Sequence, residues 1–317
     1  MRLGGDVGGT KTLLEARAGA FTLLRRRYDN DAYASFDALL ADFLADVRAH
    51  HRAAVTSACF AVAGPVEGGA ARLTNRLDWA LEADLLAVRH GLERVKLVND
   101  FVGLTAGLLE LQSEETRELQ SGRRLPEAPL LVVGPGTGCG VGVLVDGQPV
   151  PSEGGHAAFA PFDAESLALW QALGGPAQRV TAEDVLSGRG LLACYLAIAG
   201  GGSTPVASPA EVTTLAEAGE PGAMRAVRLF ARCLGSFAGD FALTLLSRGG
   251  VYVAGGIPPR LPPALFDAEF LRAFLAKGVY AELATHFPVS LVLAQDLGLR
   301  GALRLATPPG EGIRPRN

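Results

Sequence analysis

The sequence predicts an α/β fold divided into two domains. Apolar runs of strand length alternate with stretches of helical periodicity from one end of the chain to the other. The length of 317 residues is large for one hydrophobic core and suits two lobes. The 40 glycines gather in clusters, and clustered glycine is typical of tight backbone turns beside a ligand.

Composition and charge narrow the class of protein. The chain is 49% hydrophobic and 20% charged, which are ordinary globular values. Its net charge of −4 gives no electrostatic reason to expect nucleic acid or an anionic membrane as a partner. The four cysteines lie far apart without a CxxC pair, so we expect reduced thiols and no zinc site. No signal peptide or membrane span is apparent, which predicts a cytoplasmic protein.

Hydrophobic periodicity places the expected elements. The predicted strands cover residues 3–7, 12–16, 21–28, 55–62, 95–98, 130–133, 141–145, 251–254 and 289–294. The predicted helices cover residues 36–47, 102–111, 223–247 and 297–306. The predicted N-caps are Ser35, Thr181, Ser208 and Asp296. Two of them start capping boxes, Thr181 with Asp184 and Ser208 with Glu211. The polar, proline-containing stretch 113–129 is expected to be a lobe boundary or a surface excursion.

Three glycine-rich turns follow apolar runs. The first glycine turn is Asp6-Val7-Gly8-Gly9-Thr10, the second covers residues 134–140, and the third covers residues 254–257. Backbone N–H groups in such turns converge on an anion, and glycine lets a phosphate approach closely. Each turn alone fits a plain hairpin or strand–helix turn, but the set of three favours phosphate binding. A bare phosphate would repel Asp6, so this residue indicates a metal and therefore Mg²⁺ with a nucleotide.

Three short polar patterns are candidates for binding a small polar ligand. Asn99-Asp100 follows a short strand and fits either a ligand-facing pair with a general base or an Asx turn at a helix start. Glu153 and His156 lie within four residues around two glycines and have side chains that suit sugar hydroxyls. Glu183 lies inside the Thr181 capping box, and its spacing alone favours a plain role at a helix N-terminus over ligand binding.

Six motifs occur in order and together resemble one family. They are Asp6-Val7-Gly8-Gly9-Thr10, Val98-Asn99-Asp100-Phe101, Gly136-Thr137-Gly138, Glu153-Gly154-Gly155-His156, Val185-Leu186-Ser187-Gly188 and Ala254-Gly255-Gly256-Ile257. From Leu3 to Leu305 the chain resembles the bacterial glucokinase family of the actin-like sugar-kinase superfamily. The cysteine-rich zinc motif of the related repressor–kinase group is missing, so the resemblance is to the branch without it.

The resemblance implies a two-lobed actin-like, ribonuclease H-like sugar-kinase fold with a cleft between the lobes. The expected small domain comprises residues 1–108 with 298–317, and the large domain comprises residues 109–297. The implied activity is transfer of the γ-phosphate of ATP to the 6-hydroxyl of glucose, the first step of glycolysis. The implied partners are hexose and Mg-ATP, and a homodimer is expected.

The resemblance also implies residue roles. Asp100 is the expected general base, and Asn99, Glu153, His156 and Glu183 are expected to bind the sugar with it. The residues expected at ATP and Mg²⁺ are Asp6 (a metal ligand, directly or through water), Gly8, Gly9, Thr10, Gly136, Thr137, Gly138, Gly255 and Gly256. Two positions depart from the family pattern, because Lys11 stands where asparagine is frequent and Ser152 replaces a glycine.

Two alternatives stay open at this point. A kinase for another sugar, such as mannose or an amino sugar, needs the same catalytic groups and differs only at residues that read other hydroxyls. A non-catalytic sugar sensor needs a DNA-binding segment, and the first strand begins too early for a helix-turn-helix before it. The presence of Asp100 also favours an active enzyme.

Overall fold

The computed structural model of the protein describes residues 1–51, 54–74, 76–199 and 205–307, and these residues form two compact units. Unit 1 comprises residues 1–111, 147–151 and the segment from Asp296 onward, and unit 2 comprises residues 112–146 and 152–295. The sequence analysis assigns residues 147–151 to the large domain, whereas the structure groups them with unit 1. The predicted division into a small and a large functional domain stays a prediction. Residues 308–317, which it included, lie outside the described residues.

Unit 1 is a five-stranded sheet with helices and a small second sheet. The strands of these two sheets are β1 (Arg2–Val7), β2 (Lys11–Ala18), β3 (Phe21–Asp29), β4 (Ser57–Val62), β5 (Val66–Glu67), β6 (Ala70–Leu73), β7 (Arg76–Glu82) and β8 (Arg94–Asn99). The segment 147–151 adds the short strand β12 (Gln148–Val150), which belongs to neither sheet. The helices of unit 1 are η1 (Asn30–Ala32), α1 (Phe36–His50), α2 (Ala83–His90), α3 (Asp100–Gly107), η2 (Leu108–Glu110) and α11 (Leu297–Leu305). Strands β5, β6 and β7 form the small antiparallel sheet.

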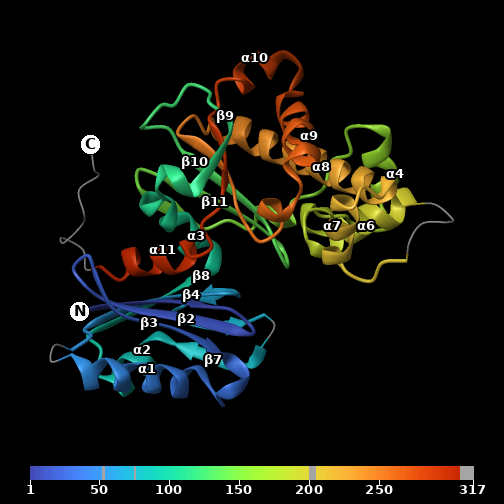
Figure 1. The fold of residues 1–317 in the computed structure, drawn as a ribbon. Coiled ribbons are helices and arrows are strands. Elements are labelled where there is room, and N and C mark those ends of the chain that lie inside the picture. The colour runs from blue at the N-terminus through green and yellow to red at the C-terminus, as the bar shows by residue number, and fades with distance from the viewer. Residues whose placement is uncertain (52–53, 75, 200–204, 308–317) are drawn as a thin grey trace. The chain divides into compact units, whose positions relative to one another are not determined.

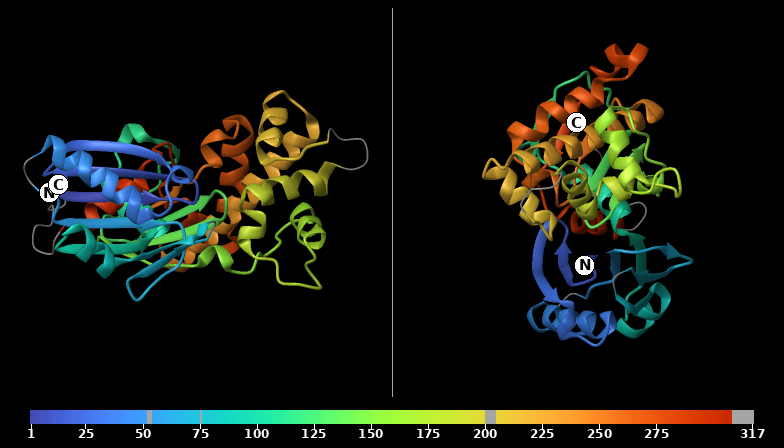
Figure 2. Two further views of the ribbon diagram at one scale, coloured as in Figure 1. Left: turned by 90° about the horizontal axis from the view of Figure 1, so that it is seen from below. Right: turned by 90° about the vertical axis from the view of Figure 1, so that its right-hand side faces the viewer.

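The main sheet of unit 1 has the order β3-β2-β1-β4-β8 and carries an apolar layer on each face. Strands β1, β4 and β8 are parallel, while β1–β2 and β2–β3 are antiparallel hairpins. Helices α1 and α11 cover opposite faces of this sheet (Figures 1 and 2). Because a parallel strand needs apolar cover on both faces, β4 is buried at every position from Ser57 to Val62.

Helices α3 and α11 pack closely through glycine. A Cβ atom added at Gly301 would lie 1.8 Å from the carbonyl oxygen of Gly103, and one at Gly107 would lie 2.3 Å from that of Leu297. The two helices therefore touch backbone to backbone. This contact fixes the N-terminus of α3, which follows directly from β8.

Unit 2 has a sheet covered by a large helical layer. Its strands are β9 (Thr116–Gln120), β10 (Leu130–Pro135), β11 (Cys139–Val145), β13 (Gly250–Val253) and β14 (Val289–Val292). Its α-helices are α4 (Ala164–Ala172), α5 (Ala182–Val185), α6 (Gly188–Ala199), α7 (Pro209–Glu217), α8 (Pro221–Leu245), α9 (Pro263–Leu275) and α10 (Ala281–Ala284). Its 3-10 helices are η3 (Ser113–Glu115), η4 (Gly154–His156), η5 (Pro258–Arg260) and η6 (Gly278–Tyr280).

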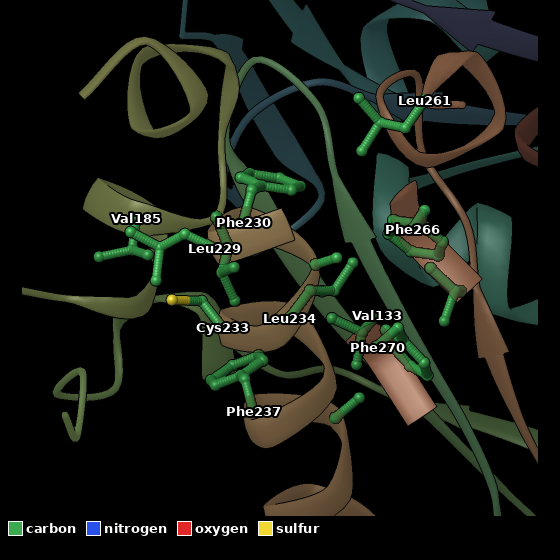
Figure 3. Packing of buried hydrophobic residues seen from close by; sticks show 14 of the residues in the cluster. Val133, Val185, Leu229, Phe230, Cys233, Leu234, Phe237, Leu261, Phe266 and Phe270 are labelled. Atoms are coloured by element: carbon green, nitrogen blue, oxygen red, sulfur yellow. The ribbon is translucent and has the colours of Figure 1, made fainter. Parts of the chain in front are cut away.

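The core of unit 2 lies around helix α8. The strands run in the order β11-β10-β13-β14-β9, with β10, β13 and β14 parallel. Side chains of α8, including Phe230 and Leu234, join those of α9, including Phe266 and Phe270, in one buried cluster (Figure 3). Because the helices and strands supply the apolar contacts of this core, the loops that follow β10 and β13 can carry polar groups.

One buried cation links three helices of unit 2. Arg232 of α8 is 8% exposed and pairs with Asp163 (Nε to Oδ2, 3.2 Å), with Glu165 of α4 and with Glu269 of α9 (Nη1 to Oε2, 3.6 Å). Although burial opposes ionisation, hydrogen bonds from Ser166 and Arg232 hold the pKa of Asp163 below its usual value. The network therefore ties α4 and α9 to α8 through charge.

Replacement of Arg232 by methionine should lower the free energy of unfolding by about 2–3 kcal/mol, because three carboxylates lose their buried partner. Arg225→Met is the matched control, since Arg225 bonds Glu165 on the surface of the same helix. That control should change the free energy by less than about 0.5 kcal/mol. Urea unfolding of both variants measures this, and equal losses in the two would contradict the assigned role of Arg232.

The predicted elements agree with the structure over most of their lengths. Ser35 caps α1, and Thr181 and Asp184 form a reciprocal capping box at α5. The stretch 113–129 begins next to the boundary between the two units, which falls after Leu111, and it also contains strand β9, which pairs with β14. Two other expectations are wrong in detail. Asp296 precedes α11 but makes no capping hydrogen bond, and Glu211 accepts the N–H of Ala207 instead of completing the box of Ser208.

The part of the chain that the structure describes contains no helix that is both long enough and apolar enough to cross a membrane. The four cysteines, Cys59, Cys139, Cys194 and Cys233, are buried and free.

Candidate functional site

The first glycine turn joins β1 to β2 in unit 1. Its backbone is closed by a hydrogen bond from the N–H of Gly8 to the carbonyl of Lys11 (3.0 Å). Within the described ranges, the N–H groups of Gly9 and Thr10 have no acceptor among the turn and loop hydrogen bonds. Two adjacent N–H groups with no such acceptor among the described residues fit an anionic oxygen. The predicted binding of a phosphate at this turn stays a prediction.

Asp6 lies at the end of β1 among other carboxylates. Burial, together with the negative charges of Asp100 and Asp296, raises the pKa of Asp6 to about 6. A Cβ atom at position 298 would approach its Oδ2 atom to 2.9 Å, so Gly298 leaves room for the carboxylate. This concentration of negative charge favours a bound cation. Among the described residues no group of three or more His, Cys, Asp or Glu side chains converges, so a cation beside Asp6 would need further ligands, such as water, from outside the protein.

The raised pKa of Asp6 has a consequence for stability. The folded state binds the proton more tightly than the unfolded chain, whose pKa lies near 3.8, so Asp6 destabilises the fold increasingly as the pH rises through this window. Asp6→Asn should therefore stabilise the metal-free protein by about 1–3 kcal/mol at pH 7.5, and the gain should shrink toward pH 4. Urea unfolding in EDTA at several pH values measures this. A gain independent of pH would contradict it.

Asn99 and Asp100 lie where β8 meets α3. Asn99 is the N-cap of α3, because its Oδ1 accepts the N–H of Phe101 (2.9 Å) while its Nδ2 donates to the carbonyl of Gly64 (3.2 Å). Asp100 is the first residue of the helix, and its Oδ1 also accepts the Phe101 N–H (2.9 Å). The helix thus starts at Asp100 and not at Val102, the predicted start. The capping interpretation is correct for Asn99, and the helix N-terminus stabilises a carboxylate at Asp100.

The second glycine turn joins β10 to β11 in unit 2, and Glu183 lies against it. The Oε2 atom of Glu183 accepts the N–H of Cys139 (3.0 Å), and a Cβ atom at Gly138 would lie 2.4 Å from it. A side chain at position 138 would therefore displace the carboxylate of Glu183, and the role of Gly138 in phosphate binding stays a prediction. A Cβ at Gly136 would meet nothing within 4 Å, so that side of the turn is open.

The Glu153–His156 segment packs on the same strand. A Cβ atom at Gly155 would lie 1.7 Å from the carbonyl oxygen of Cys139, which allows only glycine there. Glu153 and His156 have mostly exposed side chains, with Oε2 and Nε2 4.0 Å apart. Ser152, which departs from the family pattern, accepts the N–H of Gly154 through its hydroxyl (3.0 Å). This bond gives the segment a fixed start that glycine cannot supply.

The third glycine turn follows β13 and lies beside the second. Gly255 has φ of +87°, and its Cβ position would lie 2.4 Å from the carbonyl oxygen of Pro135. Both the backbone conformation and the close approach require glycine. At Gly256 a Cβ would meet nothing within 4 Å, so this residue leaves open space.

The structure thus forms two groups of predicted site residues. Unit 1 brings together Asp6, Asp100 and the first glycine turn, and unit 2 brings together the second and third glycine turns, Glu183 and the Glu153–His156 segment. Two polar residues were not singled out in the sequence. Asn30 bonds the first glycine turn, and Arg189 bonds both Glu183 (3.1 Å) and Asp184 (3.2 Å). No local pattern marks either residue.

Comparison with known proteins gives consistent matches over nearly the whole chain. A family model described as Glucokinase matches residues 3–308. A curated glucokinase of Nostoc sp. is 34% identical, covering 95% of this chain and 97% of that protein. The crystal structure of a glucokinase from an Antarctic psychrotroph has a TM-score of 0.83 and 28% identity, covering 95% of this chain and 97% of that one.

A more distant structure shares the fold. It is a ROK family glucokinase from Streptomyces griseus in complex with glucose and AMPPNP, with a TM-score of 0.65 and 21% identity, covering 96% of this chain and 98% of that one. The predicted α/β sugar-kinase fold and the predicted resemblance are confirmed by these matches.

Proposed function

Because the chain belongs to the Glucokinase family, we propose that it transfers the γ-phosphate of ATP to the 6-hydroxyl of glucose, giving glucose 6-phosphate and ADP. The observation that carries this proposal is the family match over residues 3–308, which contains all six sequence motifs. The reaction is the first step of glycolysis. The family assignment also supports a cytoplasmic location and a homodimer.

In the proposed mechanism Asp100 accepts the proton of the 6-hydroxyl as that oxygen attacks phosphorus. A positioned general base of this kind contributes about 10²–10⁴-fold to the rate. The position of Asp100 at the N-terminus of α3 supports this role, since Asn99 fixes the helix start with its own side chain. Asn99, Glu153, His156 and Glu183 hold the remaining hydroxyls of the sugar, and their pairing gives specificity.

The glycine turns hold the nucleotide in this proposal. The N–H groups of Gly9 and Thr10 and the turn Gly136-Thr137-Gly138 bind phosphate oxygens, and Gly255 and Gly256 lie under adenosine. Asp6 holds Mg²⁺ directly or through water, as its carboxylate-rich surroundings support. When bound, Mg²⁺ supplies positive charge that offsets the charge on the phosphate oxygens.

A panel of hexoses tests the proposal. ADP release from Mg-ATP should require a sugar, and glucose should give a higher kcat/KM than mannose or glucosamine. Preference for one of the other sugars would replace glucose as the substrate within the same reaction. Binding of sugar without any ADP release would overturn the kinase proposal and favour a sensor.

A further inference from the structure

Asn30 is a buried polar residue directly behind the first glycine turn. It lies in η1, immediately after β3, and its relative exposure is 0%. Its Nδ2 group donates to the carbonyl oxygens of Gly8 (2.8 Å) and Gly9 (3.2 Å). Its backbone N–H donates to the carbonyl of Thr10 (2.9 Å). Three consecutive carbonyls of the turn therefore face one residue.

The orientation of the Asn30 amide is itself fixed. Thr12 of β2 is also buried and donates from Oγ1 to the Oδ1 atom of Asn30 (2.8 Å). Because the Oδ1 atom of Asn30 faces the Thr12 hydroxyl, the NH₂ group of the same amide must face Gly8 and Gly9. Every polar atom of the Asn30 side chain is thus bonded within the turn and its two strands.

Peptide geometry turns these bonds into a constraint on the N–H groups. In a planar trans peptide the N–H points opposite to the C=O of the same unit, and no peptide of the described chain is cis. The carbonyl of Gly8 shares its peptide with the N–H of Gly9, and the carbonyl of Gly9 shares its peptide with the N–H of Thr10. Because both carbonyls point at Asn30, both N–H groups point away from the buried side.

We propose that Asn30 is a positioning residue that orients the N–H groups of Gly9 and Thr10 toward a phosphate group of the nucleotide. This inference rests on the proposed kinase function for the identity of the ligand. Asn30 does not contact the ligand itself. Its loss should weaken nucleotide binding selectively, because the turn becomes free to rotate its peptides while the sugar-binding side chains are unchanged.

The test replaces Asn30 by aspartate, which has the same shape but lacks the two donor hydrogens. KM for Mg-ATP, and the Kd for Mg-ADP measured by calorimetry, should rise about 5- to 30-fold. The Kd for glucose without nucleotide should stay within about twofold of the wild-type value.

Thr12→Val should give a smaller rise in KM for Mg-ATP and in the Kd for Mg-ADP. Thr12→Ser, which keeps the hydroxyl, should leave both constants near their wild-type values. These two variants provide the readout if the aspartate variant does not fold.

Val47→Ala is the control for a loss of stability alone. Val47 is buried in α1 of unit 1 and does not belong to the turn. This variant should lower the unfolding midpoint with unchanged KM for Mg-ATP. The inference is overturned if the Asn30 or Thr12→Val variants lose glucose and nucleotide binding together, or behave like Val47→Ala. If the wild type binds Mg-ADP through an Asn30-dependent turn but releases no ADP with any sugar, the kinase proposal fails and this inference stands.

Discussion

Asp100→Asn should lower kcat with glucose and Mg-ATP by about 10²–10⁴-fold. Asparagine keeps the size of the side chain and an oxygen that accepts the Phe101 N–H, so the start of α3 should persist. It cannot accept a proton at neutral pH, and this is the property that the proposed mechanism requires. The Kd for glucose should change by no more than about tenfold, because one hydrogen bond to a hydroxyl is altered and not removed.

Asp84→Asn is the matched control for this prediction. Asp84 is also an acidic residue in the first turn of a unit 1 helix, in this case α2, but it is exposed. Its replacement removes the same charge from the same kind of position and should leave kcat unchanged. An Asp100→Asn variant with wild-type kcat would contradict the assignment of the base, even if the enzyme phosphorylates glucose.

Gly301→Ala should lower the free energy of unfolding of unit 1 by at least about 3 kcal/mol. This loss is at the upper end of the costs that are typical of an overpacked core. The added methyl carbon would lie 1.8 Å from the carbonyl oxygen of Gly103 and 2.7 Å from the backbone nitrogen of Gly107. Because these atoms belong to the backbone of α3, no side-chain rotation relieves the clash and the two helices must separate. Asp100 begins α3, so kinase activity should fall together with stability.

Gly222→Ala is the control for this second large effect. Gly222 lies in the first turn of α8 in unit 2, and its Cβ would meet the carboxylate of Glu220 at 3.2 Å, the flexible end of a side chain. Alanine favours a helix over glycine by up to about 1 kcal/mol, while the Glu220 carboxylate, which caps α8 through the N–H of Ala223, must shift by a small amount. The two effects oppose each other, so this variant should change the free energy of unfolding by less than about 1 kcal/mol. Urea unfolding of both variants separates them. A neutral Gly301→Ala would show that α3 and α11 do not pack as described.

Local patterns predicted the fold where the stabilising contacts are local. The β1–β2 hairpin follows from two apolar runs around a glycine turn, and Ser35 and Thr181 cap helices through side chains a few residues away. Strand β9 was missed because its partner, β14, is more than a hundred residues distant and its own residues are mostly polar. The sequence correctly predicts that α11 starts after Asp296 but wrongly predicts that the Asp296 side chain caps this helix. The carboxylate pairs instead with Arg25 of β3 (2.9 Å).

The motifs of the candidate site could be predicted from the sequence, but the contacts that support these motifs could not. Glycine clusters indicated the three turns because the backbone there excludes side chains. The reason differs from one glycine to the next, however, since Gly138 accommodates Glu183 whereas Gly255 needs its positive φ. Asn30 looks like an ordinary loop residue in the sequence, because its three bonds to the first glycine turn form only when β3 returns beside β2.

The most direct test of the central claim is identification of the product. The full-length protein is incubated with glucose and Mg-ATP, and the phosphorus-containing products are quantified by ³¹P NMR. A glucokinase should form glucose 6-phosphate and ADP in equal amounts, and neither product should form without glucose. Phosphate on another hydroxyl, or ADP that forms equally well without sugar, would contradict the assignment of this chain as a glucose 6-kinase.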